Sequence, residues 1–229
     1  MKKVDSYLVL LLAGKGERLS SAIKEKKQFY LVEGKPLFSY SLEVFKKTEL
    51  FKKYILVVAK EDIKKTQDLL IKNNLSEDVI LVEGGASRNQ SVCSALIRLQ
   101  SIASSDDKIF IHDAARPIIS EKLIFSLYER SLSLDGLTPV KRIHDSVISK
   151  DKKTYINRDN YYLVLTPQVF SFSKILMCYK NYDDSLTDDY SKMDDRFKKD
   201  ILLTDDINFK VTNYSSLLLF LSFVKQKTD

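Results

Sequence analysis

The chain repeats one pattern, in which a short apolar segment of strand length precedes a longer segment whose apolar residues have helical spacing. The strand-length segments are 7–12, 54–58, 79–82 and 108–112. Helical spacing follows at 36–47 and 61–73, and again in the segments that begin at Ser87 and Ser120. The strand segments lack a regular polar alternation, which is typical of strands covered on both faces. The sequence therefore predicts an α/β fold with a doubly wound, mostly parallel twisted sheet.

Glycines and charged residues gather directly after the first of these strands, and ligands of doubly wound sheets bind beyond the carboxyl ends of the strands. The segment 12–18 reads LAGKGER, and its glycines would let backbone N–H groups wrap a phosphate chain while Arg18 adds positive charge. Leu19 occupies the third glycine position of a dinucleotide fingerprint, and the lysine spacing is not that of a Walker A loop. The motif indicates a phosphate-binding loop, with a plain tight turn as the alternative.

The third and fourth strand segments end in motifs of their own. A glycine pair at 84–85 precedes Ser87, which forms a capping-box pattern with Gln90, and glycines beside a capped helix make a slot for a planar base. Asp113 follows the fourth segment, and a carboxylate there suits a hard cation held beside phosphates. The alternative is a local turn in which Asp113 forms a salt bridge with Arg116.

Residues 139–165 break the strand–helix rhythm. Segments 146–149 and 154–157 flank a charged tip at 150–153, and together they predict a β-hairpin. A hairpin alone is only marginally stable in water, whereas packing on a second copy would cover its apolar face. We therefore interpret 1–229 as a single domain in which 139–165 forms a protruding arm for dimerisation.

Composition narrows the function classes. The chain has 37 Lys+Arg against 31 Asp+Glu, a net charge of +6, which suits phosphate-bearing ligands, although the lysines are scattered as on an ordinary solvated surface. The two cysteines form no CxxC pair, which indicates a reducing compartment and argues against structural zinc. No apolar run reaches the roughly 18 residues of a membrane span, so we expect a cytoplasmic protein without a membrane partner. His112 is expected to pack within its strand rather than to act in catalysis.

The chain resembles the 2-C-methyl-D-erythritol 4-phosphate cytidylyltransferases through motifs that occur in the family's order: LAGxGxR, KQ, GGxxRxxSV, HDAARP, TPQ and NFKVT. The combination of HDAARP with TPQ is the most specific, and the resemblance spans about 7–224. Ribitol-5-phosphate cytidylyltransferases share the scaffold and most of these motifs. The resemblance implies a Rossmann-like nucleotidyltransferase fold, CTP and a polyol phosphate as substrates, and Mg²⁺ or another divalent cation. It also implies a homodimer joined through the arm.

The resemblance further implies roles for individual residues. Those implied to act on the triphosphate in catalysis are Arg18, Lys27 and Lys210. Those implied to bind the nucleotide are Ala13, Gly14, Lys15, Gly16, Gly85, Arg88 and Ser91. Those implied to bind the polyol phosphate are Asp113, which also faces the metal, Arg116, Thr187 and, from the arm of a partner subunit, Ser146 and Arg158. The TPQ motif, 166–168, is implied to form a structural strand beside the site.

Two departures from the family pattern leave alternatives open. Lys26 stands where the family has a proline, and a longer gap after Arg18 makes Lys26 an alternative to Lys27 as the catalytic lysine. The arm contains a short insertion that brings in Arg142 and His144. The altered arm keeps ribitol 5-phosphate open as the substrate. A non-catalytic nucleotide- or nucleic-acid-binding module is the remaining alternative, but no aromatic–basic stacking motif supports it, and we expect no nucleic-acid partner.

Overall fold

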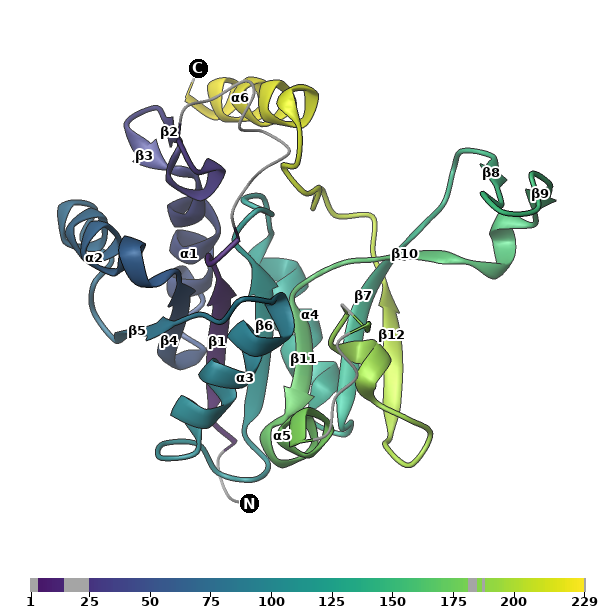
Figure 1. The fold of residues 1–229 in the computed structure, drawn as a ribbon, viewed down its shortest axis with the longest axis horizontal. Helices are drawn as coiled ribbons and strands as arrows, with labels where there is room; N and C mark the ends of the chain where they lie inside the picture. Colours follow the sequence, from purple (N-terminus) through teal and green to yellow (C-terminus); the bar gives the residue numbers. More distant parts are fainter. Residues whose placement is uncertain (1–3, 15–24, 181–184, 187, 229) are drawn as a thin grey trace.

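A computed structural model describes residues 4–14, 25–180, 185–186 and 188–228. In this part of the chain, the main element is an eight-stranded mixed sheet in the order β10-β7-β11-β6-β1-β4-β5, with β12 beside β7 (Figure 1). Its strands are β1 (Ser6–Leu11), β4 (Phe51–Val58), β5 (Val79–Glu83), β6 (Lys108–Asp113), β7 (Gly136–Arg142), β10 (Tyr162–Val164), β11 (Gln168–Ser171) and β12 (Lys199–Leu203).

The predicted parallel part of the sheet is confirmed. β1 lies between β4 and β6 and is parallel to both, so that Leu11 stands beside Val57 on one side and Asp113 on the other. β5 continues the parallel arrangement beyond β4. The chain therefore runs outward from β1 through β4 to β5 and then returns to the opposite side of β1 as β6. Such a reversal of strand order creates a crevice at the carboxyl ends of the strands, where ligands of this fold class bind.

Antiparallel strands extend the sheet on the side of β6. β11 is antiparallel to both β6 and β7, and β10 is antiparallel to β7. β12 lies parallel to β7, with Ile201 beside Thr138. Gln168 of the TPQ motif begins β11 and lies beside Ile111, so this motif borders the end of β6 as the resemblance implied.

Helices cover both faces of the sheet, which explains the strands that are apolar throughout. Leu8 and Leu10 of β1 pack on one face with α1 (Leu37–Lys47), α2 (Ile63–Lys72) and α4 (Glu121–Ser131). Tyr7 and Val9 pack on the other face with α3 (Arg88–Leu99) and α5 (Phe172–Lys180). The predicted helix starts are confirmed, because the side chains of the N-cap residues at 87 and 120 accept hydrogen bonds from backbone N–H groups three residues later.

Smaller elements complete the described chain. The helix α6 (Tyr214–Thr228) packs over the hairpin of β2 (Leu31–Val32) and β3 (Lys35–Pro36) through a separate apolar cluster. Short 3-10 turns occur at Lys27–Phe29, Lys60–Asp62, Arg158–Asn160 and Tyr190–Lys192. Within the ranges given above, the structure has no helix with the length and apolar character needed to cross a membrane.

The segment between β7 and β10 extends away from the sheet. β8 (Val147–Ile148) pairs with β9 (Tyr155–Ile156) in a separate antiparallel ladder, at the position where the sequence predicts paired segments. Figure 1 shows this ladder beyond β10, on the side of the molecule opposite β4 and β5. Its use as an arm that contacts a partner subunit stays a prediction.

Candidate functional site

A cavity of about 690 Å³ lies at the carboxyl ends of the parallel strands. Ala13 and Gly14 line it after β1, Ala59 after β4, Gly84 after β5 and Ala114 after β6. The cavity therefore occupies the crevice that the reversal of strand order creates between β1 and β6. Its position agrees with the sequence-based expectation that the unusual residues meet at the strand ends.

The structure brings eight of the predicted site residues to this cavity, although they come from segments far apart in the sequence: Ala13, Gly14, Lys27, Gly85, Arg88, Ser91, Asp113 and Lys210. Four more predicted residues lie outside the described part of the chain: Lys15, Gly16, Arg18 and Thr187. The remaining three, Arg116, Ser146 and Arg158, do not line this cavity.

One wall of the cavity is formed by the close approach of the ends of β1 and β5 to the start of α3. A Cβ atom on Gly84 would lie 2.6 Å from the Cβ of Ala13 and 2.9 Å from the Oγ of Ser91, so this position requires glycine. The Ser87 side chain accepts a hydrogen bond from the Gln90 backbone N–H at 3.1 Å. The capped N-terminus of α3 thus faces the cavity, where its backbone N–H groups favour an anion.

Asp113 forms the acidic centre of the site. Its Oδ2 accepts a hydrogen bond from the Lys210 Nζ at 2.7 Å, and its Oδ1 lies 3.5 Å from the Arg88 Nε. Burial raises the pKa of the Asp113 carboxyl, but the charges of Arg88 and Lys210 outweigh burial and hold that pKa well below its ordinary value. The side chain therefore stays ionised throughout the neutral and mildly acidic range.

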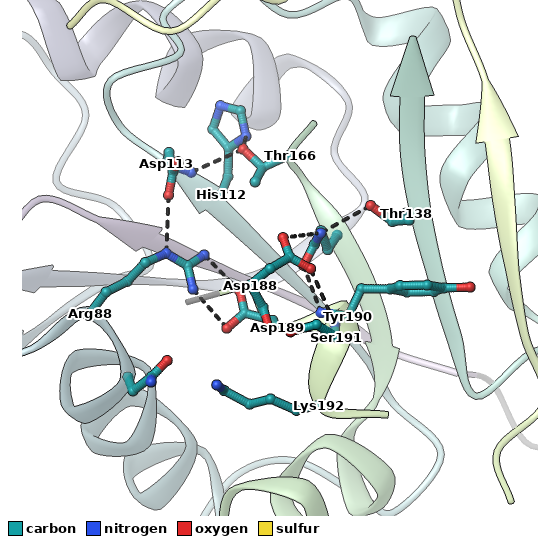
Figure 2. A network of polar contacts seen from close by, with 12 residues as sticks. Arg88, His112, Asp113, Thr138, Thr166, Asp188, Asp189, Tyr190, Ser191 and Lys192 are labelled. Carbon is teal, nitrogen blue, oxygen red and sulfur yellow. Dashed lines mark hydrogen bonds and ion pairs between the residues drawn. The ribbon is translucent and has the colours of Figure 1, made fainter. Parts of the chain in front are cut away.

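Arg88 forms a bidentate ion pair that sequence reasoning did not predict. Its Nη1 and Nη2 donate to the two carboxylate oxygens of Asp189 at 2.8 and 2.7 Å, and Figure 2 shows the guanidinium between Asp189 and Asp113. The Asp189 side chain is fully buried and also accepts a hydrogen bond from the Tyr179 hydroxyl. Burial lowers the pKa of Arg88, but the attraction of Asp189 outweighs burial, so that this pKa lies above its ordinary value. The only signal in the sequence was a pair of adjacent aspartates beside Thr187.

The two candidate lysines have different surroundings. The Lys26 Nζ pairs with Glu61 Oε1 and Asp62 Oδ2, each at 2.7 Å. The Lys27 Nζ instead donates to the backbone carbonyl of Val211 at 3.1 Å, directly after Lys210 in the chain. Lys26 is thus paired with two carboxylates, whereas Lys27 is brought to the segment that holds the second predicted catalytic lysine.

Gln28, the second residue of the KQ motif, joins the lysines to the glycine loop. Its Nε2 donates to the backbone carbonyls of Leu12 at 2.8 Å and of Gly14 at 3.0 Å. The side chain is almost fully buried. The position of Lys27 relative to the end of β1 is therefore fixed by its neighbour in the sequence.

The HDAARP, TPQ and NFKVT motifs are joined by hydrogen bonds. The Arg116 Nη1 donates to the backbone carbonyl of Asn208 at 2.9 Å, and the Asn208 Nδ2 donates to the carbonyl of Thr166 at 2.7 Å. Burial lowers the pKa of Arg116, partly offset by Asp113. Arg116 thus joins the segment before Lys210 to the end of β6.

The arm residues lie apart from the cavity of their own chain. Ser146 and Arg158 are exposed and belong to the segment around β8 and β9, and Arg158 donates to the backbone carbonyl of His144. These two residues have no part in the cavity wall of this chain.

His112 is a packed strand residue, as predicted. It is completely buried, its Nε2 lies 3.0 Å from the carbonyl oxygen of Arg116, and its Nδ1 lies 3.0 Å from the Thr166 Oγ1. Its ring packs edge-on against Phe45. Burial lowers the pKa of His112 from 6.5 to about 4, so the ring is neutral at neutral pH.

We expect this histidine to make the fold sensitive to acid. Between pH 6.5 and about pH 4, the unfolded chain binds a proton at His112 that the folded protein does not bind. Stability therefore falls as pH falls through this window, by roughly 3 kcal/mol in total. Denaturant unfolding at pH 7 and pH 4 should show a smaller loss for His112→Gln than for the wild type. The matched control, His144→Gln, alters the chain's other histidine, which is exposed, and should keep the wild-type dependence. An unchanged pH dependence in His112→Gln would contradict this account.

A divalent cation fits the cavity only if the protein and a phosphate chain both supply ligands to it. Among the described residues, no group of three or more His, Cys, Asp or Glu side chains could hold a metal ion. The acidic side chains of the described cavity wall are Asp113 and Glu61, and Glu61 is paired with Lys26. Because Mg²⁺ keeps several waters and binds through one or two carboxylates plus substrate phosphates, Asp113 alone is a suitable donor set.

Comparisons with known proteins agree with the motifs. The profile of the 2-C-methyl-D-erythritol 4-phosphate cytidylyltransferase family matches residues 7–226. Proteins of that name from Clostridium kluyveri and Thermotoga neapolitana are 32% and 35% identical to this chain, over 81% and 72% of both chains in each pair. The solved structure of 4-diphosphocytidyl-2C-methyl-D-erythritol synthase from Anaerococcus prevotii has a TM-score of 0.79 at 21% identity, covering 97% of this chain and 99% of that one. At that identity, the structural likeness concerns the fold.

Proposed function

The chain belongs to the 2-C-methyl-D-erythritol 4-phosphate cytidylyltransferase family, and from this premise we propose that the cavity beyond β1, β5 and β6 binds CTP for attack by the polyol phosphate. The protein is a CTP-dependent nucleotidyltransferase of isoprenoid precursor synthesis. It transfers CMP from CTP to 2-C-methyl-D-erythritol 4-phosphate and releases pyrophosphate. The observation that supports this location best is the convergence of Lys27, Asp113 and Lys210 on one cavity.

The reaction is a direct displacement. A phosphate oxygen of the polyol phosphate attacks the α-phosphorus of CTP, the bond from that phosphorus to the β-phosphate oxygen breaks, and pyrophosphate leaves with the electron pair. The attacking phosphate is already anionic near neutral pH, so the protein needs neither a covalent intermediate nor a strong general base. Its task is to align two polyanions and to neutralise the charge that develops on the pentavalent transition state.

The cationic side chains divide this task. Lys27 and Lys210 lie on the cavity wall and would oppose the charge of the phosphates, while the glycine pair 84–85 before α3 would form the slot for the base. Asp113 holds the Lys210 ammonium through its hydrogen bond and offers a carboxylate oxygen to a cation. Asp113 would hold Mg²⁺ or another divalent cation, which would supply charge neutralisation at the phosphates of CTP. Arg18 would add charge from the glycine loop.

Lys27 is the better candidate for the catalytic lysine. Lys26 also lines the cavity, but its ammonium group is already paired with the carboxylates of Glu61 and Asp62. Lys27 lies next to the Lys210 segment, where a second positive charge would face the same phosphate chain. The geometry thus supports Lys27 over Lys26.

We further propose that single-domain subunits form a homodimer through the arm of residues 139–165. The arm, which includes β10, carries exposed apolar side chains that support a dimer: Ile148, Tyr155, Tyr161, Tyr162, Leu163 and Val164. A second copy would cover this surface and would let Ser146 and Arg158 reach the partner's polyol phosphate. Equilibrium sedimentation tests this part, and a monomer at micromolar concentration would contradict it.

The experiment for the function is product analysis with the purified protein. Incubation with CTP, Mg²⁺ and 2-C-methyl-D-erythritol 4-phosphate should give CDP-methylerythritol, identified by mass spectrometry, and an equal amount of pyrophosphate. A chelator should abolish both products, and added Mg²⁺ should restore them. Pyrophosphate that forms without the polyol phosphate would indicate hydrolysis of CTP and would contradict the proposed transfer.

A further inference from the structure

The segment of residues 188–190 is held by one side chain of β11, the buried amide of Gln168. The Gln168 Nε2 donates to the Asp188 Oδ2 at 2.8 Å and to the Thr138 Oγ1 at 3.0 Å, while the Tyr190 backbone N–H donates to the Gln168 Oε1 at 3.0 Å. Figure 2 shows these contacts beside the Arg88 side chain. Because its two neighbours are tied to a buried strand residue, the backbone of Asp189 has little freedom to move.

Asp189 in turn restricts the movement of the Arg88 side chain. Both of its carboxylate oxygens accept hydrogen bonds from the guanidinium, and the Tyr179 hydroxyl donates to one of them. A bidentate pair fixes the plane of the guanidinium as well as its position. The orientation of the Arg88 Nε is therefore determined by Asp189, which itself does not line the cavity.

Arg88 in turn faces the acidic centre of the site. Its Nε lies 3.5 Å from the Asp113 Oδ1, while Lys210 occupies the Oδ2 at 2.7 Å. The Arg88 side chain is 26% exposed and lines the cavity, whereas its partner Asp189 is fully buried. A guanidinium that could swing freely would close on Asp113 and compete with Lys210 and with a phosphate-bound cation.

We propose that Asp189 is a positioning residue, which holds Arg88 beside Asp113 and thereby sets the orientation of the Asp113 carboxylate. This inference rests on the proposed function, in which Asp113 holds Lys210 and faces the cation. Asp189 does not line the cavity, and in this proposal it acts through Arg88. The predicted consequence is that the effect of Asp189 on turnover depends on Asp113.

A double-mutant cycle on kcat tests this dependence. Asp189→Asn should lower kcat by roughly 10–100-fold, the range seen when an outer partner of a site residue is removed. In an Asp113→Asn background, the same substitution should change kcat by less than about twofold, because the carboxylate that it orients is gone. An equal loss in both backgrounds would mean that Asp189 acts through general destabilisation, and it would overturn the inference.

The surface pair between Asp194 and Arg196 offers a matched control. Asp194→Asn also breaks an Asp–Arg pair in the same region of the chain, but that pair is exposed, so kcat should stay within about twofold of wild type. If Asp189→Asn fails to fold, Tyr179→Phe removes only one of the hydrogen bonds to Asp189. Its loss of kcat should again disappear in the Asp113→Asn background.

An NMR measurement tests the inference without turnover, so its failure is distinguishable from failure of the proposed function. In the wild type, the bidentate pair should slow rotation of the Arg88 guanidinium and give separate Nη resonances. Asp189→Asn should collapse these resonances and shift the Arg88 Nε–H signal, and Asp113→Asn should shift only the Nε–H signal. Retention of the wild-type Arg88 signals in Asp189→Asn would overturn the inference, whatever the activity of the wild type.

Discussion

Lys27→Met should lower kcat for pyrophosphate release by roughly 10²–10³-fold, equivalent to about 3–4 kcal/mol of transition-state stabilisation. The reason is that Lys27 lies beside the Lys210 segment, where an ammonium group opposes the charge that develops on the transferring phosphorus. Steady-state kinetics at saturating CTP and polyol phosphate measure this loss. Far-UV circular dichroism should show an unchanged fold, since methionine keeps most of the unbranched apolar part of the lysine side chain.

Lys26→Met is the matched comparison for this prediction. Lys26 is the adjacent lysine, and its ammonium group already pairs with Glu61 and Asp62. We expect a loss in kcat of less than about tenfold, because the interactions removed are partly exposed ion pairs, which contribute little. Lys26 also lines the cavity, so the reverse order of the two variants would show that Lys26 exchanges its carboxylate partners for CTP and is the catalytic lysine.

Arg88→Met should lower the free energy of unfolding by roughly 3–5 kcal/mol, the usual cost of leaving a buried charge without its partner. The Asp189 side chain is fully buried, and Arg88 is its bidentate partner. Urea unfolding followed by circular dichroism measures the change. The double variant Arg88→Met/Asp189→Asn should recover part of the loss, because it also removes the unpaired charge.

An exposed Arg–Asp pair shows whether burial is the cause. Arg130 pairs with Asp200 at 2.6 Å, but these side chains are 50% and 42% exposed. Arg130→Met should therefore change the free energy of unfolding by no more than about 1 kcal/mol. A loss for Arg88→Met as small as that for Arg130→Met would contradict the account of Asp189 as a buried partner that depends on Arg88.

The parts of the fold that the sequence predicts are those set by local chemistry. Ser87 and Ser120 begin helices because their side chains cap backbone N–H groups within the next turn. The strands around β1 are recognisable because both of their faces are buried. β12 escapes such reasoning, since Lys199 and Asp200 open it with charge and it becomes a strand only by pairing with β7.

The candidate site also has a part that the sequence predicts and a part that it does not. Glycines and cations at strand ends are visible in the sequence, and Asp113 and Lys210 are found through their motifs. Asp189 cannot be found in this way, because its partner Arg88 lies 101 positions earlier and because Asp189 is buried only after the chain has folded. The choice between Lys26 and Lys27 likewise depends on the ion pair between Lys26 and Glu61. That pair joins residues far apart in the sequence, so it is not visible before the chain has folded.

The most direct test of the function is the ratio of kcat/KM for 2-C-methyl-D-erythritol 4-phosphate to that for ribitol 5-phosphate, measured by pyrophosphate release with CTP and Mg²⁺. We expect turnover with the methylerythritol phosphate and a ratio of at least about 10², since a site built to hydrogen-bond one polyol leaves polar groups unpaired with another. A ratio below one would contradict the assignment of the acceptor. It would direct attention to Arg142, His144 and Ser146 in the arm. No turnover with either acceptor would contradict the assignment of the reaction itself.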